Sequence, residues 1–398
     1  KIPVSKRELS QAEEIEKFVK EQDAEYQRRF NALELFTGAP SNRNPNQYTA
    51  MVLEERDKPR KTHVMIRGDF LKLGVEVSPG TPAVLPAIEP GAPANRLTLA
   101  KWLVDPKNPL TARVTMNRIW QQYFGRGLVK TSEDFGSQGE KPSHPELLDW
   151  LATEFIGRQW SMKAMHRLIV TSATYRQSST VTPELAERDP ENILLARSPR
   201  YRVEGEVVRD IALAASGLLN PEVGGPSVFP PQPPGVTDLS RGNMPWIVET
   251  GRNRYRRGLY TFWKRTSPYP ALTIFDAPTA EQMTLRRNRS NSPMQALTTL
   301  NDEVFVETAQ ALALRVLRDV PSDDNARLRY AFKLCLSREP DAGERDTLAS
   351  TLARRLDPAQ ANDILPPNAP AGIDPMKYAA WFGVSRILLN LDETITRE

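Results

Sequence analysis

The loop between residues 134 and 144 holds the side chains best suited to acid–base chemistry. Asp134, Glu140 and His144 share a stretch with glycines at 136 and 139, and this stretch leads into an expected helix N-terminus. Such a loop can turn tightly, and its free N–H groups can bind an anion. Asp134 or Glu140 could be the acid or base, with His144 as partner, in a cleft near Arg118. The alternative is structural, with Asp134 capping the turn and His144 in the first helical turn.

A second candidate is a basic and aromatic stretch in the middle of the chain. Residues 241–290 hold ten Lys or Arg and three Asp or Glu, a net +7 against +4 for the whole chain. Guanidinium groups grip carboxylates and sulfates, and they also stack on aromatic rings. We therefore predict that Arg254, Arg256 and Trp263 bind an anionic polysaccharide or glycan. The alternative is that these cations pair with carboxylates of the chain itself, and we do not expect a nucleic-acid partner.

Three further arginines, Arg286, Arg287 and Arg289, come just before an expected helix at residue 293. Cations next to the positive end of a helix dipole are locally unfavourable. Such a placement requires an anion, which is either a ligand or a buried carboxylate. We include these arginines and Arg118 in the predicted ligand-binding set.

The composition excludes several other kinds of site. Cys335 is the single cysteine, so an intramolecular disulfide, a thiolate zinc site and a C-x-x-C-H haem attachment are excluded. With three histidines, a His-rich metal centre is not expected, and we predict no metal and no cofactor in this chain. An oxygen-ligand site stays open. No apolar run approaches the roughly 18 residues that a membrane span needs.

The hydrophobic pattern predicts a mainly α fold, a large irregular helical module with a few short strands and long Pro-rich surface loops. Four helices are expected over residues 95–177, with N-caps at Asn95 and Ser161 and a capping box at Ser143. Further helices are expected at residues 15–33, 203–219, 293–318, 324–336, 341–356 and 374–391. Short strands are expected at residues 62–67 and 258–263.

The prolines suggest how these elements are connected. There are 34 among 398 residues, and they concentrate at 79–93, 221–234 and 358–375. We interpret these Pro-rich segments as rigid, extended connections that run across one module. Residues 1–60 then form a linker helix and an irregular segment, and residues 61–398 form the main domain. Within that domain, helical subunits 95–220 and 291–398 are bridged by the basic segment 221–290.

Several strings of the sequence resemble a known family when they are taken together. They are NRLTLAKWL at 95–103, NRIWQQYFGRGLV at 117–129, EDFG at 133–136, HPELLDWL at 144–151, Arg287, QAL at 295–297, LND at 300–302 and LLNLDE at 388–393. As a set they are similar to the C-terminal planctomycete-specific domain, a domain of unknown function found in large exported proteins. The resemblance covers about residues 60–398.

The resemblance implies export to the periplasm or cell surface of a planctomycete-like bacterium. It also implies that the domain follows an N-terminal c-type cytochrome segment, so that haem c would belong to an upstream part of a longer protein. The N-terminus has no signal peptide, and we therefore expect this chain to be part of a longer exported protein. The family supplies no catalytic mechanism that can be assigned residue by residue.

Three functions remain open at this point. The preferred one is a module of a cell-envelope protein that binds or processes complex anionic polysaccharide. The second is an enzyme or a redox partner of the upstream haem segment, with Asp134, Glu140 and His144 at its site. The third is a structural or assembly module whose polar motifs brace loops and which interacts with the upstream domains.

Overall fold

The computed structural model describes residue 18 and residues 51–56, 58, 60–237, 245–321, 323–353, 361, 364–366, 369–370 and 372–397. The chain divides into two compact units, residues 1–80 and 81–398, and each is described by itself. The helix predicted at residues 15–33 lies outside the described residues, apart from Phe18. The predicted division at residue 60 and the linker role of residues 1–60 stay predictions.

The first unit contains a β-hairpin. Strand β1 (Thr62–Met65) pairs antiparallel with β2 (Leu73–Val77), and the 3₁₀ helix η2 (Ile66–Gly68) lies between them. Arg67 and Gly68 both have positive φ, which turns the chain at the point where the sequence predicted that the strand ends. Strand β1 lies within the strand predicted at residues 62–67, and β2 was not predicted.

The second unit begins with the four predicted helices, α3 (Arg96–Leu103), α4 (Thr111–Phe124), α5 (Pro145–Gly157) and α6 (Met162–Val170). The side chains of Asn95 and Ser161 accept hydrogen bonds from the N–H groups of Thr98 and Ala164, as predicted for N-caps. The predicted capping box at Ser143 is wrong. The N-cap of α5 is His144, and the Ser143 hydroxyl instead donates to the Leu128 carbonyl at 3.3 Å.

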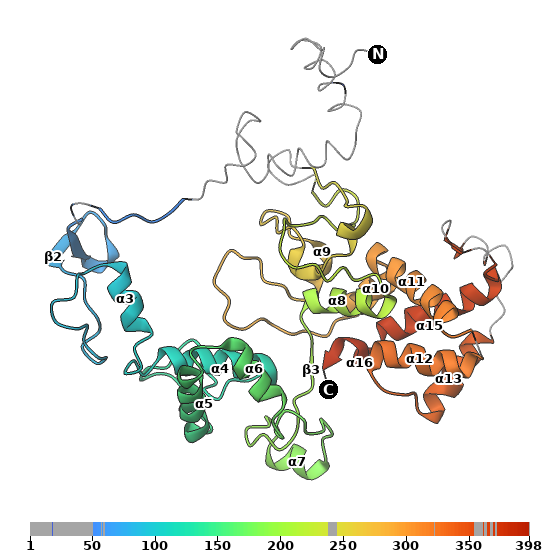
Figure 1. Ribbon diagram of the computed structural model, residues 1–398, viewed down its shortest axis with the longest axis horizontal. Coiled ribbons are helices and arrows are strands. Elements are labelled where there is room, and N and C mark those ends of the chain that lie inside the picture. Colours follow the sequence, from blue (N-terminus) through green and yellow to red (C-terminus); the bar gives the residue numbers. More distant parts are fainter. Residues whose placement is uncertain are drawn as a thin grey trace. The chain divides into compact units, whose positions relative to one another are not determined.

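Helices α4, α5 and α6 enclose an apolar core, and Figure 1 shows them in green and blue-green beside one another. Met116, Leu151 and Met165 are almost fully buried there. The rings of Trp120 and Phe124 stack with centroids 4.1 Å apart. This core gives the loop that follows α4 a rigid base.

The middle of the chain is less regular. It contains α7 (Pro183–Arg188), β3 (Tyr201–Arg202), α8 (Gly205–Ser216), η3 (Gly251–Tyr255), η4 (Gly258–Tyr260) and α9 (Pro270–Ile274). The strand predicted at residues 258–263 is wrong, because η4 and a single β-bridge between Val228 and Thr261 take its place. Gly258 lies so close to α8 that a Cβ atom would come within 2.6 Å of the Glu206 carbonyl oxygen, and that approach imposes the turn.

The C-terminal helices form the larger core. They are α10 (Pro293–Asn301), α11 (Glu303–Asp319), α12 (Asp324–Leu336), α13 (Ala342–Leu352), α15 (Pro375–Asn390) and α16 (Asp392–Ile395), and strand β4 (Thr396–Arg397) follows and pairs with β3. The single helix predicted over residues 293–318 is wrong. Asp302 has extended backbone angles and caps α11 by accepting from the Val304 N–H, so it divides the run into two helices.

Helix α11 packs against α15 and α8, and Leu312, Val316, Trp381 and Leu388 are almost completely buried between them. These helices are orange, red and light green in Figure 1. The small strands β1–β2 and β3–β4 make the only sheets of the described residues. The fold is therefore mainly α, as predicted.

Candidate functional site

A buried amide network fastens the loop after α4 to that helix. Asn117 is completely buried, and its Oδ1 accepts from the Val129 N–H at 2.8 Å. Its Nδ2 donates to the Val129 carbonyl at 3.0 Å and to the Ser132 hydroxyl at 3.1 Å. The Ser132 hydroxyl donates in turn to Oε1 of Gln121, one helical turn after Asn117. Because all these groups are satisfied inside the protein, the network holds residues 127–132 in one conformation.

Glycine is required where the loop passes over this network. Gly125 ends α4 with a φ of 73°. A Cβ atom on Gly127 would lie 2.6 Å from Nδ2 of Asn117 and 2.6 Å from the Val129 carbonyl oxygen. The motif NRIWQQYFGRGLV is therefore explained as a helix together with the loop that it fastens.

The next part of the loop is organised by Thr131. The Thr131 hydroxyl donates to the Asp134 carbonyl oxygen at 2.8 Å and accepts from the Glu140 N–H at 2.9 Å. The Asp134 carboxylate accepts from the Gly136 N–H at 2.7 Å. Asp134 thus shapes a tight turn and lies close to Glu140 along the same loop.

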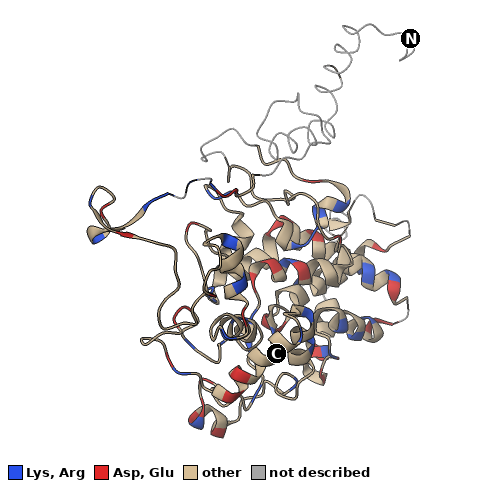
Figure 2. Ribbon diagram, turned by 60° about the vertical axis from the view of Figure 1, so that its left-hand side comes forward, with Lys and Arg blue, Asp and Glu red and all other residues tan. Residues whose placement is uncertain are grey.

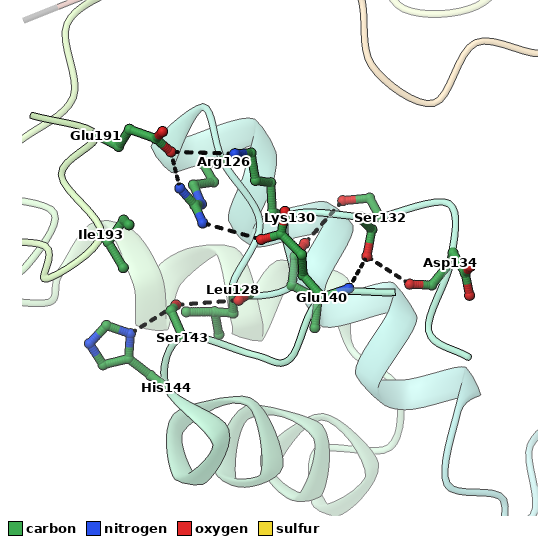
Figure 3. A network of polar contacts seen from close by, with 12 residues as sticks. Arg126, Leu128, Lys130, Ser132, Asp134, Glu140, Ser143, His144, Glu191 and Ile193 are labelled. Atoms are coloured by element: carbon green, nitrogen blue, oxygen red, sulfur yellow. Dashed lines mark hydrogen bonds and ion pairs between the residues drawn. The ribbon is translucent and has the colours of Figure 1, made fainter. Parts of the chain in front are cut away.

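Glu140 takes part in an ion-pair network, which Figure 3 shows from close by. Its carboxylate lies 3.7 Å from the Arg126 guanidinium, which also binds Glu191. The Lys130 ammonium lies 3.5 Å from the Glu191 carboxylate. This network has two cations and two anions, so it is balanced in charge.

His144 does not join Asp134 and Glu140. Its Nδ1 lies 3.1 Å from the Ser143 hydroxyl oxygen. In Figure 3 the imidazole ring points away from Glu140. Over the described part of the chain, no hydrogen bond or ion pair connects His144 with either acid. The structure brings the backbones of Asp134 and Glu140 together at the Thr131 hydroxyl. The Asp134 carboxylate binds the Gly136 N–H, whereas the Glu140 carboxylate faces Arg126.

Arg254 pairs with carboxylates of the chain itself. It binds Glu303 at 2.8 Å and Glu307 at 2.9 Å, both on α11. The Tyr255 hydroxyl donates to Glu307 at 2.7 Å, and burial together with this bond raises the pKa of Tyr255 to about 12. These contacts fix η3 against α11, as expected under the alternative that the cations pair with carboxylates of the chain itself.

Arg256 is buried and Trp263 is partly buried. Arg256 is 3% exposed, donates to the carbonyls of Glu222, Gly224 and Pro226, and lies 3.7 Å above the Tyr260 ring. Trp263 packs against a small buried cluster that contains Tyr269. Arg256 thereby holds the Pro-rich segment 221–234 against the chain around residue 260.

Two of the three arginines before α10 have partners as well. Arg287 binds Glu206 at 2.7 Å and Glu204 at 3.1 Å, at the start of α8. Arg289 lies 4.1 Å above the Tyr201 ring, and the Tyr201 hydroxyl donates to the Gln122 carbonyl at 2.6 Å. The anion that the sequence required near this helix end is, for Arg287, a pair of the chain's own carboxylates. In Figure 2, likewise, charges of both signs are interspersed along the helices.

Arg286 and Arg118 differ from the others. Both are exposed, and none of the ion pairs between described residues involves either of them. Arg118 lies on α4, and Arg286 lies in the loop between α9 and α10. The predicted ligand-binding residues therefore do not converge on one surface site.

An open hollow of about 390 Å³ lies between the loop after α4 and the loop before α10. It is lined by Gln121, Lys130, Thr131, Ser132, Glu133, Glu140, Met283, Leu285 and Arg286. Of the predicted site residues, Glu140 and Arg286 take part. The other lining residues were not predicted from the sequence. Asn117 and Gln121 are amides on an otherwise apolar helix face, and this pattern could have indicated a buried polar network.

The structure also bears on other kinds of site. No group of three or more His, Cys, Asp or Glu side chains that could hold a metal ion occurs among the residues described. Burial raises the pKa of the Cys335 thiol to about 12, so this thiol is not reactive near neutral pH. None of the described helices is long and apolar enough to cross a bilayer.

Comparison with known proteins gives one match. The family model described as PSD1, a protein of unknown function (DUF1553), matches residues 95–352. No curated protein and no solved structure matches the chain. The matched range includes both loops that line the hollow and the helices that fasten them. The chain therefore belongs to the PSD1 family of proteins of unknown function.

Proposed function

We propose that this module binds a complex polysaccharide of the cell envelope and that the hollow between the two loops receives one or two sugar units. The observation that carries the proposal is the polar lining of an accessible hollow of about 390 Å³. Small-molecule sites occupy about 300–1,000 Å³. The resemblance to exported proteins supports an envelope location, which remains part of the proposal.

The chemistry of the lining fits a saccharide. Sugar hydroxyls both donate and accept hydrogen bonds, and the hollow offers the Glu133 carboxylate as acceptor and the Lys130 ammonium and Arg286 guanidinium as donors. Glu133 and Arg286 make no side-chain hydrogen bond or ion pair with another described residue. They can therefore bind a ligand without breaking a contact of the fold.

The fixed wall of the hollow supports the same function. Gln121 and Ser132 are held by the network that Asn117 organises, and Thr131 is held by its hydrogen bonds with Asp134 and Glu140. A preorganised wall lowers the conformational entropy that is lost on binding. Binding is favoured over catalysis, because Asp134 and Glu140, the acids predicted for catalysis, make no hydrogen bond or ion pair with His144 among the described residues.

The second candidate is a structural module, and a separate observation favours it. Arg254, Arg256 and Arg287 all bind groups of the chain itself. A protein that uses its arginines to join loops to helices can serve as a rigid support for other domains. Under this alternative the hollow takes no ligand.

The experiment is a glycan array that holds neutral, carboxylated and sulfated oligosaccharides, followed by calorimetric titration of any binder. Glu133→Gln and Lys130→Gln should each weaken binding at least tenfold, because both groups line the hollow. The control is Arg252→Gln, an exposed arginine that does not line the hollow, and it should stay within twofold of the wild type.

Arg118→Ala separates the hollow from the site near Arg118 that the sequence suggested. A loss of binding with Arg118→Ala and none with Glu133→Gln would move the site to the outer face of α4. If no glycan binds, the polysaccharide function is rejected and the structural module is favoured.

A further inference from the structure

The loop between α9 and α10 is closed at its base, and Figure 1 shows it as the long loop that joins these two helices. At one end, Asp276 accepts hydrogen bonds from the Ser290 N–H at 2.8 Å and from the Ser290 hydroxyl at 2.9 Å. Arg202 also binds Asp276 and donates to the Ser290 carbonyl at 2.9 Å. Residues 276–290 therefore form an Ω-loop, a compact surface loop whose ends meet, and such loops often carry function.

The two ends of the Ω-loop are strongly fastened, and its middle is not. Gln295 of α10 donates to the Ser290 hydroxyl at 3.1 Å and to the Ile274 carbonyl at 2.9 Å, which ties both ends to one buried side chain. The middle, residues 279–284, is exposed throughout, and Met283 is 91% exposed. The middle can thus change position while the base stays in place.

The Ω-loop carries three arginines, and they have unequal surroundings. Arg287 binds two carboxylates and Arg289 lies on the Tyr201 ring, so both are committed to the fold. Arg286 is exposed, lines the hollow and has no carboxylate partner among the described residues. It is the cation of the Ω-loop that is available to a ligand.

The opposite wall limits what that ligand can be. Arg126, Lys130, Glu140 and Glu191 balance one another in their ion-pair network. The unpaired charges of the lining are then Glu133 and Arg286. Glu133 would repel a polyanion that carries charge on every side. A sugar unit with one anionic substituent could place that substituent against Arg286 and its hydroxyl groups against Glu133.

We infer that Arg286 on the Ω-loop is the specificity-determining residue of the hollow and selects saccharide units that carry one anionic substituent, a carboxylate or a sulfate ester. This inference rests on the polysaccharide function proposed above. The guanidinium can bind either oxyanion in a bidentate manner, so the two sources share one chemistry.

The test compares three matched tetrasaccharides, one neutral, one with a carboxylate on each repeat and one with a sulfate on each repeat, by calorimetric titration against the full chain. The wild type should bind at least one of the anionic ligands ten times or more tightly than the neutral one. Arg286→Gln should remove that preference, so that the neutral and the anionic ligands bind the variant with affinities within twofold of one another. The arm that binds more tightly identifies the carboxylate or the sulfate as the ligand group.

Arg252→Gln is the matched control, because it removes an equal charge at an exposed position outside the hollow, and it should keep the full preference. Arg286→Lys should restore part of the preference for anionic ligands, because lysine keeps the positive charge but lacks the planar guanidinium group. If Arg286→Gln keeps the wild-type preference, or if the wild type binds neutral and anionic ligands equally, the inference is wrong although the polysaccharide function stands. If no ligand binds at all, both are wrong.

Discussion

The loop at residues 125–143 and the Ω-loop at residues 276–290 line the same hollow, and different chemistry holds each in place. The first is fastened to α4 by the neutral side chains of Asn117, Gln121 and Ser132. The second is fastened at its base by the charged pair Arg202 and Asp276. Salt has little effect on neutral buried hydrogen bonds. The loss of one partner from a buried ion pair strongly destabilises the fold, because the other charge stays buried without compensation.

The comparison also separates two mechanical roles. The amide network reaches along the loop as far as Ser132, so that the wall itself is fixed. The ion pair reaches only the base of the Ω-loop, so that its middle, including Met283, stays exposed. Under the proposed function, one fixed and one adjustable wall would hold a sugar unit in place and still admit substituents of different size.

The largest effect is expected when the ion pair is broken. Arg202→Met leaves Asp276 partly buried without its cation, and we expect a loss of about 3–5 kcal/mol in the free energy of unfolding. Urea unfolding measures it. The control is Arg200→Met, whose partner Asp392 and own side chain are both about half exposed, and it should cost at most about 1 kcal/mol. Equal losses for the two variants would refute the special role of the buried pair.

The neutral network should give a somewhat smaller effect. Asn117→Leu leaves the buried Val129 N–H without a partner and removes one hydrogen bond each from the Val129 carbonyl and the Ser132 hydroxyl, at about 2–4 kcal/mol in total. The loss should be the same at low and high salt when measured by urea unfolding. Gln122→Ala, exposed on the same helix, should change stability by no more than about 0.5 kcal/mol. A salt-dependent loss for Asn117→Leu would contradict the neutral description.

The third effect tests how closely the first loop passes over the network. Gly127→Ala places a Cβ atom 2.6 Å from the Val129 carbonyl oxygen, and relief of this clash should cost about 1–3 kcal/mol. Thermal unfolding followed by circular dichroism measures it. Gly157→Ala in α5 meets no atom within 4 Å and should be neutral or stabilising by about 0.5–1 kcal/mol. A neutral Gly127→Ala would show that this loop is looser than described.

The smallest effect concerns an exposed charged contact. A hydrogen bond from Arg338 lowers the pKa of Glu344 from its usual 4.5 to about 2. Because this pKa is lower in the folded protein than in the unfolded chain, the stabilisation is complete above pH 4.5 and disappears as the pH falls from 4.5 to 2. Solvent screening limits it to about 0.5 kcal/mol.

Glu344→Gln tests this contact by urea unfolding at two pH values. The variant should be less stable than the wild type at pH 6 and equal to it near pH 2. Arg338 also binds Glu393. The difference in stability between the wild type and Glu344→Gln at pH 6 should be smaller at high salt and should be measurable in low-salt buffer. A difference that is the same at both pH values would show that Glu344 acts through packing and not through charge.

Local sequence signals were sufficient for much of the helical fold. Asn95, Ser161 and the Pro293 helix start follow from capping chemistry within three or four residues, and the helix of residues 324–336 was predicted at its observed bounds. The capping box at Ser143 failed because the Leu128 carbonyl, fifteen residues earlier, takes its hydroxyl. The continuous helix through Asp302 failed because Asp302 prefers to cap α11.

The site was less accessible to prediction. The chemistry of Asp134, Glu140 and His144 follows from residue type, but their orientations depend on Thr131, Ser143 and Arg126. The arginines of the central segment could have faced a ligand or a carboxylate, and the sequence alone left both open. The carboxylate partners of Arg254 and Arg287 lie 49 to 83 residues away along the chain, so no local pattern could identify them. They are Glu303 and Glu307 for Arg254, and Glu204 and Glu206 for Arg287.

The sequence by itself determined the mainly α class, most helix bounds and the exclusion of an intramolecular disulfide and of a thiolate zinc site, because these depend on short-range periodicity, capping and composition. Only the tertiary structure decided which arginine is free. Burial and ion pairing act between residues far apart in the chain, and they commit Arg254, Arg256 and Arg287 while Arg286 stays exposed at the hollow.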